Sequence, residues 1–373
     1  MNVRPIPLDR IPAHVVALHD YEALARERLD DNAWTYLASG AGDELTMRWN
    51  REAFNETRLT QRVLAAFSGG HTGVQLLGLS LPHPVILAPV AYQKLFHPQG
   101  EGASARAAAV MGAVFVAATL ASTTLEEIAA ASEGAPQWFQ LYVQQDRART
   151  LDLVRRAEAA GYRGLMVTVD APVNGVRNAE QRIGFRLPPG VVAANLQGGV
   201  HAQSPSPVCD GHPIFDGLLA HAPTWADLQW LRSVTRLPLI VKGILSPQDA
   251  KQAIACGADA LVVSNHGGRT LDTLEASLSA LPHIKAAVGD SVPLLLDSGV
   301  KRGTDVLKAM ALGASAVMIG RPYAMALAAA GALGVAHALR LLVEEFTVAM
   351  ALSGCAHPGA IDASVLSRRA TLP

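Results

Sequence analysis

The sequence predicts an α/β protein folded as a (β/α)8, or TIM-type, barrel. Short apolar runs suited to parallel strands buried on both faces recur eight times from residue 84. Helical patterns separate them, and three of these end in glycine just before the next strand, at Gly161, Gly257 and Gly313. A doubly wound open sheet is the alternative fold, but no Gly-x-Gly-x-x-Gly motif follows the first strand. The alternation of strand and helix therefore favours the barrel.

The eight expected strands lack the polar alternation of a half-exposed sheet. They cover residues 84–88, 113–117, 138–142, 164–169, 239–241, 260–263, 294–296 and 316–319. Between the fifth and sixth strands, Ser246 and Pro247 indicate a helix start and Gly257 its end. We expect a single domain, because the eight units form one uninterrupted series apart from one long insertion.

Three segments lie outside the minimal barrel, which we expect over residues 81–345. Residues 1–80 form an N-terminal cover with one helical stretch, 20–38, followed by a glycine-rich turn. Residues 187–224, after the fourth strand, are rich in Pro, Gly and His without periodicity, which is typical of a long mobile loop or lid. Residues 346–373 form a C-terminal segment.

The composition argues against several classes of protein. With 31 Lys and Arg against 32 Asp and Glu, the formal charge is −1, so we expect neither a nucleic-acid partner nor an acidic membrane surface. The three cysteines are far apart, which predicts no disulfide framework and no zinc site. The N-terminus has prolines and charges where a signal peptide needs an apolar core, and the apolar run 323–338 is too short to span a bilayer. We therefore expect a soluble cytoplasmic protein.

Ionisable side chains gather where the expected strands end, which is where a barrel places its chemistry. The strand-end residues are Ala91, Thr119, Tyr142, Asp170, Lys242, His266, Asp297 and Arg321. Taken singly, His266 could be a structural hydrogen bonder, Lys242 a solvated charge and Arg321 a helix cap. Together on one rim, they indicate an active site. No His-x-His, His-x-x-x-His or acidic cluster is present, so no metal site is expected.

The last two strand ends carry a second pattern, typical of phosphate binding. Residues 297–303, DSGVKRG, follow the seventh strand, and Gly320-Arg321-Pro322 follows the eighth. Barrels often bind phosphate with these loops through glycine amides and a cation. The rim thus predicts a phosphate-bearing cofactor beside a small substrate.

Several motifs in order resemble one enzyme family. The stretch SNHGGRTLD, residues 264–272, closely resembles the SNHG(G/A)RQLD signature of the FMN-dependent α-hydroxy acid oxidases and dehydrogenases, which include glycolate oxidase and lactate oxidase. The likeness runs from YLASGAGDELTMRWNREAF through FQLYV, TVDAP, LPLIVKGI and DSGVKRGTDVLKAMALGA to IGRP and ALSGC, nearly the whole chain. The stretches APVAYQKLFHPQGE and TLAS most resemble the hydroxymandelate oxidase branch.

The resemblance implies a role for each matching residue. His266 would be the base that takes a proton from a 2-hydroxy acid, and Asp170 would stabilise its protonated imidazole. Arg177 and Arg269 would clamp the substrate carboxylate, a task suited to the guanidinium fork. The phenols of Tyr36 and Tyr142 would hydrogen-bond substrate. Whether the electrons leave as a hydride or after a carbanion is left open.

The resemblance also implies FMN as cofactor. Lys242 would lie near the flavin ring and stabilise its anionic reduced form. The other implied contacts are Pro89, Val90, Ala91, Ala118, Gln140, Thr168, Ser264, Asp297, Ser298, Gly299, Lys301, Gly320 and Arg321.

Five positions depart from the family pattern. Thr270 replaces a common Gln, Val90 a Thr, Lys301 an Arg, and Ala118 a Ser, while Leu120 stands where glycolate oxidase has a Trp against the substrate side chain. None of these removes a catalytic group. Because leucine is smaller than tryptophan, we expect a substrate larger than glycolate, mandelate-like or of medium chain length.

Several alternatives remain open from the sequence. Oxygen is the expected electron acceptor, yielding hydrogen peroxide, and a quinone or partner protein is the alternative. A Schiff-base lyase that uses Lys242 as nucleophile is a more distant reading, as is a barrel that binds FMN without turnover. The family resemblance implies a homotetramer or octamer.

Overall fold

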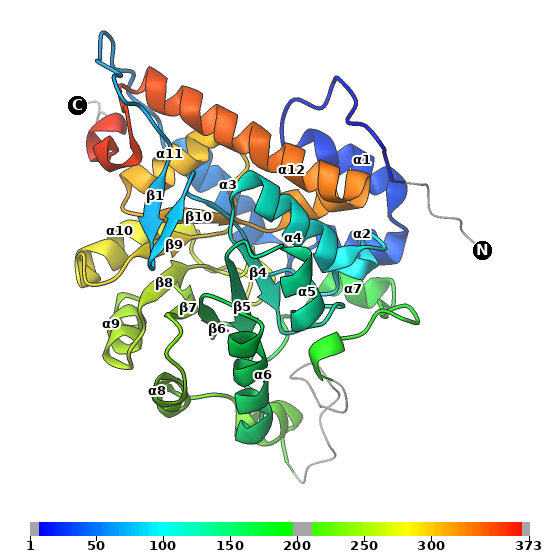
Figure 1. Cartoon of the computed structure of the whole chain (residues 1–373). Coiled ribbons are helices and arrows are strands. Elements are labelled where there is room, and N and C mark those ends of the chain that lie inside the picture. The colour runs from blue at the N-terminus through cyan, green and yellow to red at the C-terminus, as the bar shows by residue number, and fades with distance from the viewer. Residues whose placement is uncertain (1–6, 197–210, 368–373) are drawn as a thin grey trace.

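The computed structural model describes residues 7–196 and 211–367, and its centre is a closed barrel of eight parallel strands (Figure 1). The order around the barrel is β10-β3-β4-β5-β6-β7-β8-β9. The strands are β3 (Val85–Leu87), β4 (Phe115–Ala118), β5 (Gln137–Leu141), β6 (Leu165–Thr168), β7 (Leu239–Ile244), β8 (Ala260–Val263), β9 (Leu294–Leu296) and β10 (Ala316–Ile319). The predicted barrel and its eight strands are confirmed, each with its bounds shifted by only a few residues.

Burial on both faces explains why these strands show no polar alternation. Ile86, Met166 and Val262 point into the barrel and form one apolar cluster. Their neighbours Leu87, Val167 and Val263 point outward and join the larger cluster beneath the helices. Each strand therefore separates two apolar layers, as in parallel sheets covered by helices.

Helices alternate with the strands and surround them in Figure 1. Ser246 caps its helix as expected, because its side chain accepts from the amides of Gln248 and Asp249. The three glycines expected to end helices have φ angles of +85°, +93° and +109°, in the region that disfavours other residues. The helices that surround the barrel are α4 (Gly100–Met111), α5 (Leu125–Ala131), α6 (Arg147–Ala159), α8 (Trp225–Val234), α9 (Pro247–Ala255), α10 (Ser277–Val288), α11 (Gly303–Ala311) and, after the last strand, α12 (Arg321–Leu352).

The predicted helical stretch over 20–38 is divided into two helices in the structure. These are α1 (Asp20–Arg28) and α2 (Asp31–Ala38), and α3 (Leu45–Glu56) follows. The break occurs at Asp30, whose extended backbone cannot continue α1 and whose carboxylate accepts from the amide of Ala33, 2.7 Å away. An aspartate N-cap thus begins a second helix where periodicity alone predicts continuity.

A short hairpin at the opposite end of the barrel has no counterpart among the predicted elements. Its strands, β1 (Val74–Leu76) and β2 (Leu79–Leu81), pair antiparallel around a turn that contains Gly78. Leu76 and Leu81 pack into the barrel interior with Ile86 and Trp138. The expected N-terminal cover therefore divides into helices that reach the site end and a hairpin that closes the other end.

The long insertion after β6 is only partly described. The expected mobile loop 187–224 includes residues 197–210, which lie outside the described residues. On either side of them lie α7 (Asn178–Arg182) and the short turns η2 (Ala194–Leu196), η3 (Pro213–Leu218) and η4 (Leu219–His221).

Helix α12 continues past the expected barrel boundary at residue 345, to Leu352, with a kink at Ala330 and Gly331. Within the described residues it is the one helix long and apolar enough to cross a membrane, so the expectation that this segment is too short does not hold. However, 61% of the most apolar 18-residue stretch of α12 is buried inside the protein, and the helix packs against α1, α4 and α11. A core helix of a barrel accounts for these properties.

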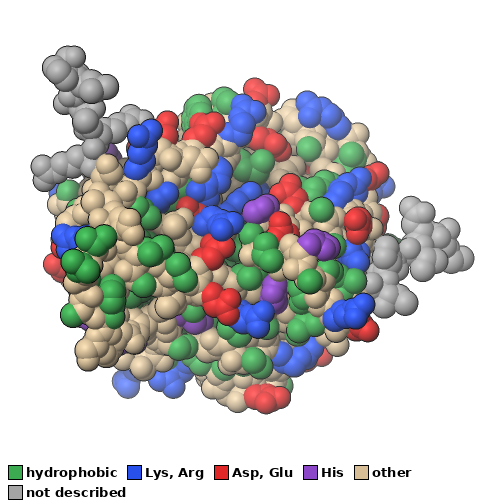
Figure 2. All heavy atoms as spheres, turned by 90° about the horizontal axis from the view of Figure 1, so that it is seen from above, with side chains coloured by type: hydrophobic (Ala, Val, Ile, Leu, Met, Phe, Trp, Pro, Cys, Tyr) green, Lys and Arg blue, Asp and Glu red, His purple; other side chains and the backbone are tan. Residues whose placement is uncertain are grey.

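The C-terminal segment and the protein surface complete the fold. After α12 come η5 (Pro358–Ala360) and η6 (Ala363–Val365), and Leu366 pairs with Leu59 beside the N-terminal helices. On the face seen in Figure 2, basic and acidic side chains are interspersed, in keeping with a formal charge of −1.

Candidate active site

A cavity of about 420 Å³ opens at the C-terminal ends of the barrel strands. Most of the residues that the sequence places in the site line it: Tyr36, Pro89, Val90, Ala91, Ala118, Leu120, Gln140, Tyr142, Thr168, Arg177, Lys242, His266, Arg269, Asp297, Ser298, Gly299, Lys301, Gly320 and Arg321. Asp170 and Ser264 are not on the wall, and each is hydrogen-bonded to a residue that is. The structure therefore brings the predicted set together, with two members behind the surface.

His266 and Asp170 form a hydrogen-bonded pair, with Nδ1 of the imidazole 2.9 Å from Oδ1 of the carboxylate. Burial alone would raise the pKa of Asp170, but the charges of His266 and Lys242 and the hydrogen bond from His266 outweigh it and lower that pKa. Because the ionised carboxylate can only accept a hydrogen bond, Nδ1 of His266 carries the proton and donates it. Nε2 is then left as a proton acceptor on the cavity wall.

The turn that follows β8 gives His266 its position. His266, Gly267 and Gly268 have φ angles of +58°, +65° and +73°, three successive residues in the left-handed region. A Cβ at Gly268 would stand 2.8 Å from the backbone nitrogen of Met47, so the turn also needs glycine for space. The amide of His266 donates to Ser264 Oγ. The two glycines thus allow the sharp turn that presents the imidazole and Arg269 to one cavity.

Lys242 is a buried ammonium held by its neighbours. Its Nζ lies 2.8 Å from Ser264 Oγ and 3.0 Å from Asp297 Oδ2. Burial would lower the pKa of Lys242, but the carboxylates of Asp297 and Asp170 raise it above its usual value. Lys242 therefore stays charged, and this cationic state suits stabilisation of a neighbouring anion.

Arg177 and Arg269 come from different loops and meet at the carboxylate of Glu180. Glu180 Oε1 is 3.4 Å from Nη1 of Arg177 and 3.2 Å from Nη2 of Arg269. Nη1 of Arg269 donates to the carbonyls of Tyr36 and Ser39, each at 2.7 Å. The two predicted arginines thus lie close together, and Glu180 is an addition that the sequence-based prediction missed.

Two phenols and an aromatic stack border the arginines. The Tyr36 ring stacks on Phe185 at 5.0 Å between centroids, and the Arg269 guanidinium lies over Tyr36 at 4.9 Å. Burial raises the pKa of Tyr36 and that of Tyr142. Both phenols therefore remain neutral and can donate hydrogen bonds to a ligand.

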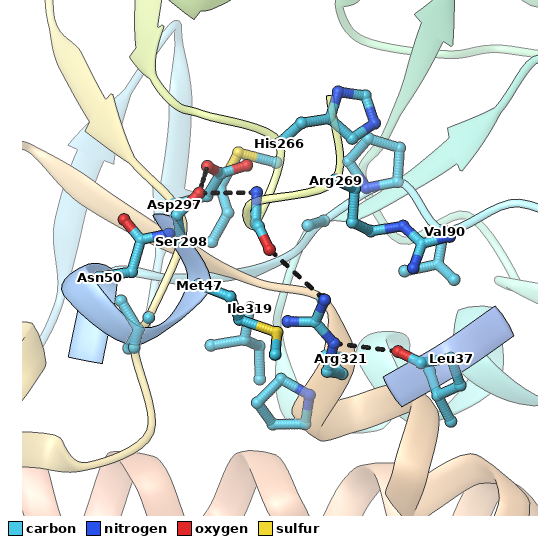
Figure 3. Close-up of a pocket in the computed structure, with 18 of the residues that line it drawn as sticks. Leu37, Met47, Asn50, Val90, His266, Arg269, Asp297, Ser298, Ile319 and Arg321 are labelled. Carbon is cyan, nitrogen blue, oxygen red and sulfur yellow. Dashed lines mark hydrogen bonds between the residues drawn. The ribbon is translucent and has the colours of Figure 1, made fainter. Parts of the chain in front are cut away.

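At the end of the cavity where α12 begins, Arg321 donates through Nη2 to the carbonyl of Ser39, which also accepts from Arg269. Nε of Arg321 donates to the carbonyl of Leu37 at 2.9 Å, as Figure 3 shows. Burial and then the charge of Arg269 lower the pKa of Arg321 to about 10. Gly299 has φ +95°, and a Cβ there would stand 2.8 Å from the carbonyl oxygen of Asn50. Arginine, glycine backbone and the wall residue Lys301 make this end suited to an anion.

On the cavity wall, Gln140 has a fully buried side-chain atom without a partner among the described residues. Gln140 accepts from the Thr119 amide through Oε1, at 3.2 Å, while its buried Nε2 donates to no described atom. A buried donor without an acceptor costs roughly 1–3 kcal/mol. A bound ligand can supply the hydrogen-bond acceptor that Gln140 Nε2 lacks.

Residues of α3 were also missed by the sequence-based prediction. Met47 and Asn50 line the cavity, and Figure 3 shows them beside Ser298. Asn50 and Asn265 donate hydrogen bonds to each other, at 2.8 and 2.7 Å, and so connect α3 to the turn that carries His266. The only sequence signal was that the quoted motif YLASGAGDELTMRWNREAF spans α2 and α3. Among the described residues, no group of three His, Cys, Asp or Glu is arranged to hold a metal.

Comparison with known proteins extends this description. A family model described as FMN-dependent dehydrogenase matches residues 25–368. The chain is 50% identical over 350 residues to L-lactate oxidase of Alicycliphilus denitrificans, covering 94% of this chain and 96% of the relative. It is 42% identical over 337 residues to glycolate oxidase 1 of Zea mays, covering 90% and 91%. A crystal structure of mandelate oxidase with benzoyl-formic acid superposes with a TM-score of 0.86 at 43% identity, covering 94% and 98%.

Proposed function

The chain belongs to the FMN-dependent dehydrogenase family and is an FMN-dependent 2-hydroxy acid oxidase, and on that premise we propose its substrate size and its electron acceptor. The substrate is an (S)-2-hydroxy acid larger than glycolate, mandelate-like or of medium chain length. It is oxidised to the 2-oxo acid, and oxygen takes the electrons and forms hydrogen peroxide. The relatives and solved structures include oxidases named for lactate, glycolate and mandelate, which supports the reaction class across substituents of different size.

The residues in the cavity fit FMN. The unpartnered Nε2 of Gln140 is a donor for a ring acceptor, the Lys242 ammonium suits a ring that becomes anionic, and Arg321 with Lys301 suits a phosphate. Ala91 and Ala118 leave room on the wall for a flat ring system. When bound, FMN accepts the two electrons that leave the substrate.

The remaining steps are performed by side chains of this chain. Arg177 and Arg269 bind the substrate carboxylate, which fixes the C2 atom relative to the base. His266 accepts a proton through Nε2, because its Nδ1 is committed to Asp170 at 2.9 Å. The charge that appears on the imidazole is stabilised by the ionised Asp170 carboxylate. Neutral Tyr36 and Tyr142 orient the hydroxyl and carboxylate oxygens through hydrogen bonds.

The observation that carries the substrate proposal is Leu120 on the cavity wall. Leu120 is 4% exposed and follows β4, and its carbonyl accepts from the amide of Tyr92 at 3.0 Å. The loop is therefore fixed, and the size of the side chain at this position sets the size of the space. Leucine is smaller than tryptophan by a ring, so a phenyl or medium alkyl substituent fits where an indole would exclude it.

The rival reading as a Schiff-base lyase conflicts with the state of Lys242. An amine nucleophile must be neutral, and lysines used in this way have depressed pKa values. The two neighbouring carboxylates raise the pKa of Lys242 instead. The family assignment supports the same conclusion.

Location and assembly complete the proposal. We propose a cytoplasmic protein, supported by two buried free thiols, Cys256 and Cys355, and by the absence of a disulfide between described residues. We propose a homotetramer or octamer on the family resemblance alone.

A panel of (S)-2-hydroxy acids tests both parts of the proposal. Glycolate, lactate, 2-hydroxyoctanoate and mandelate would be assayed for peroxide in air and for dye reduction without oxygen. We expect mandelate or 2-hydroxyoctanoate to exceed glycolate in kcat/KM, with peroxide matching substrate consumed. Preference for glycolate would overturn the size proposal, and dye reduction without peroxide would overturn the acceptor.

A further inference from the structure

Glu180 lies at the arginine pair and has no role in the reaction described above. It is on the short helix α7, in the segment that leads away from Asp170. One oxygen, Oε1, contacts both guanidinium groups, at 3.4 Å from Arg177 and 3.2 Å from Arg269. The three side chains are 13–16% exposed, so water screens them little. This is a shared ion triad on the wall of the cavity rather than a surface ion pair.

The backbone around the triad leaves it little freedom. Nε of Arg177 donates to the carbonyl oxygen of Arg269 at 3.3 Å, which joins the two loops directly. A Cβ at Gly175 would stand 2.0 Å from the carbonyl oxygen of Thr270, so the loops pass each other in backbone contact. The two loops that carry the arginines are therefore fixed relative to each other, and Glu180 follows Arg177 by three residues in one of them.

The arginines keep donors for a ligand while they contact Glu180. Nη1 of Arg269 is occupied by the Tyr36 and Ser39 carbonyls and its Nη2 by Glu180, but among the described residues Nη2 of Arg177 donates no hydrogen bond. A carboxylate can therefore bind without displacing Glu180. Burial and then the charge of Arg177 lower the pKa of Arg269, while Tyr36 and Glu180 act in the opposite direction.

The charges of the triad determine which ligands it suits. Two guanidinium groups and one carboxylate give a net charge of +1. A substrate with one carboxylate brings the site to neutrality, whereas a second carboxylate on the substituent leaves an excess negative charge in a poorly solvated cavity. Glu180 also repels any further anion directly.

We propose that Glu180 is a specificity-determining residue, which cancels one arginine charge and so restricts the site to 2-hydroxy acids with a single carboxylate and an uncharged substituent. The proposal rests on the function proposed above, because it assumes that the arginine pair binds the substrate carboxylate. It differs from a purely structural role in one respect. A structural ion pair affects all ligands alike, while a charge-setting residue affects monoanions and dianions differently.

The test measures ligand binding to the FMN-loaded enzyme by the change in flavin absorbance. The probes are propionate and malonate, similar in size but with one and two charges at roughly pH 8. Glu180→Gln keeps the shape of the side chain and removes its charge. We expect the preference for propionate over malonate to fall by about tenfold or more, from the loss of one nearby like charge. L-Malate should become a better substrate relative to 2-hydroxybutyrate by a similar factor.

Two variants provide controls. Glu180→Asp keeps the charge and should keep the wild-type preference for propionate. This variant separates the effect of charge from that of shape, and it also provides a test if Glu180→Gln does not fold. Glu158→Gln removes a carboxylate from a more exposed pair, with Arg155 three residues away on the outside of the barrel, and should leave the propionate-to-malonate ratio unchanged. If Glu180→Gln and wild type share the same propionate-to-malonate ratio, or if Glu180→Asp loses the preference, the proposal is overturned. Failure of every 2-hydroxy acid to reduce the flavin of the wild type would instead overturn the proposed function.

Discussion

At the N-terminal end of the barrel, Leu76 and Leu81 of the hairpin cover an apolar interior that includes Ile86 and Trp138. At the C-terminal end of the barrel, Lys242 lies on β7 and Asp170 follows β6, and both are almost as well buried but charged. The hairpin needs only complementary shape, whereas each charge at the rim needs a partner at hydrogen-bond distance. The difference shows where this molecule places stability and where it places chemistry.

Both ends contain strained backbone and unpaired buried atoms, which at the hairpin end are Leu77, with φ +48°, and Trp138 Nε1, but at the rim these features lie beside charged side chains. His266 and Ser298 have positive φ angles, and Gln140 Nε2 and Asp170 Oδ2 are buried without a described partner. Such features persist only where the surrounding structure enforces them and are characteristic of functional sites. Substitutions at the two ends should therefore affect different measurements.

The largest effect is expected from His266→Ala at the rim. Loss of a general base typically costs ~10²–10⁴-fold in rate. Flavin reduction measured by stopped flow should fall by that amount, while FMN content and thermal unfolding stay close to wild type. Near-normal reduction by this variant would remove His266 from the reaction.

At the opposite end, Leu81→Ala should lower the free energy of unfolding and leave the chemistry intact. Deleting a buried leucine side chain costs about 2–5 kcal/mol, and Leu81 is 3% exposed. Chemical denaturation gives the free energy, and kcat per bound FMN gives the activity. A fall in kcat per FMN without loss of stability would mean that the two ends are not separate in function.

A smaller effect is expected from Leu120→Trp, which changes the rim without touching a charge. The indole would fill the space that we assign to the substituent, so the ratio of kcat/KM for mandelate to that for glycolate should fall by about tenfold or more. Leu120→Ile, which keeps the volume, should leave the ratio near wild type. If the tryptophan variant ranks substrates as wild type does, Leu120 is not the selective wall.

The smallest effect concerns the pH dependence of stability. The folded state lowers the pKa of Asp170 below its unfolded value of about 3.9, so its carboxylate stabilises the fold above that pH. This contribution disappears as the pH falls through the folded pKa. The difference in unfolding free energy between wild type and Asp170→Asn should therefore shrink from pH 7 towards pH 3, and a constant difference would contradict this assignment.

The strands could be predicted because burial on both faces gives each strand a continuous apolar sequence. Most of the site could be predicted because a barrel brings the C-terminal ends of its strands together. His266 and Lys242 were found from that rule alone. The hairpin was not predicted, since its strands have only three residues each around Gly78. The break between α1 and α2 depends on the N-cap at Asp30, which hydrophobic periodicity does not detect.

The residues missed in the site lie away from strand ends. Glu180 is on α7 and reaches Arg269 only through the folded loop, although its spacing of three from Arg177 is a signal that a local pairing rule could have used. Asn50 lies on α3 and acts through Asn265. Contacts between loops distant in sequence set both positions, and neither hydrophobic periodicity nor the strand-end rule predicts such contacts.

The central claim is that the rim removes hydrogen from C2 of a 2-hydroxy acid and passes the electrons to bound FMN. Anaerobic mixing of the FMN-loaded enzyme with (S)-mandelate, and with mandelate deuterated at C2, tests it most directly. The flavin absorbance should bleach, and it should bleach several-fold more slowly with the deuterated acid, because the C2 bond breaks as the flavin is reduced. An unchanged flavin spectrum with mandelate and with every other acid of the panel would contradict the account.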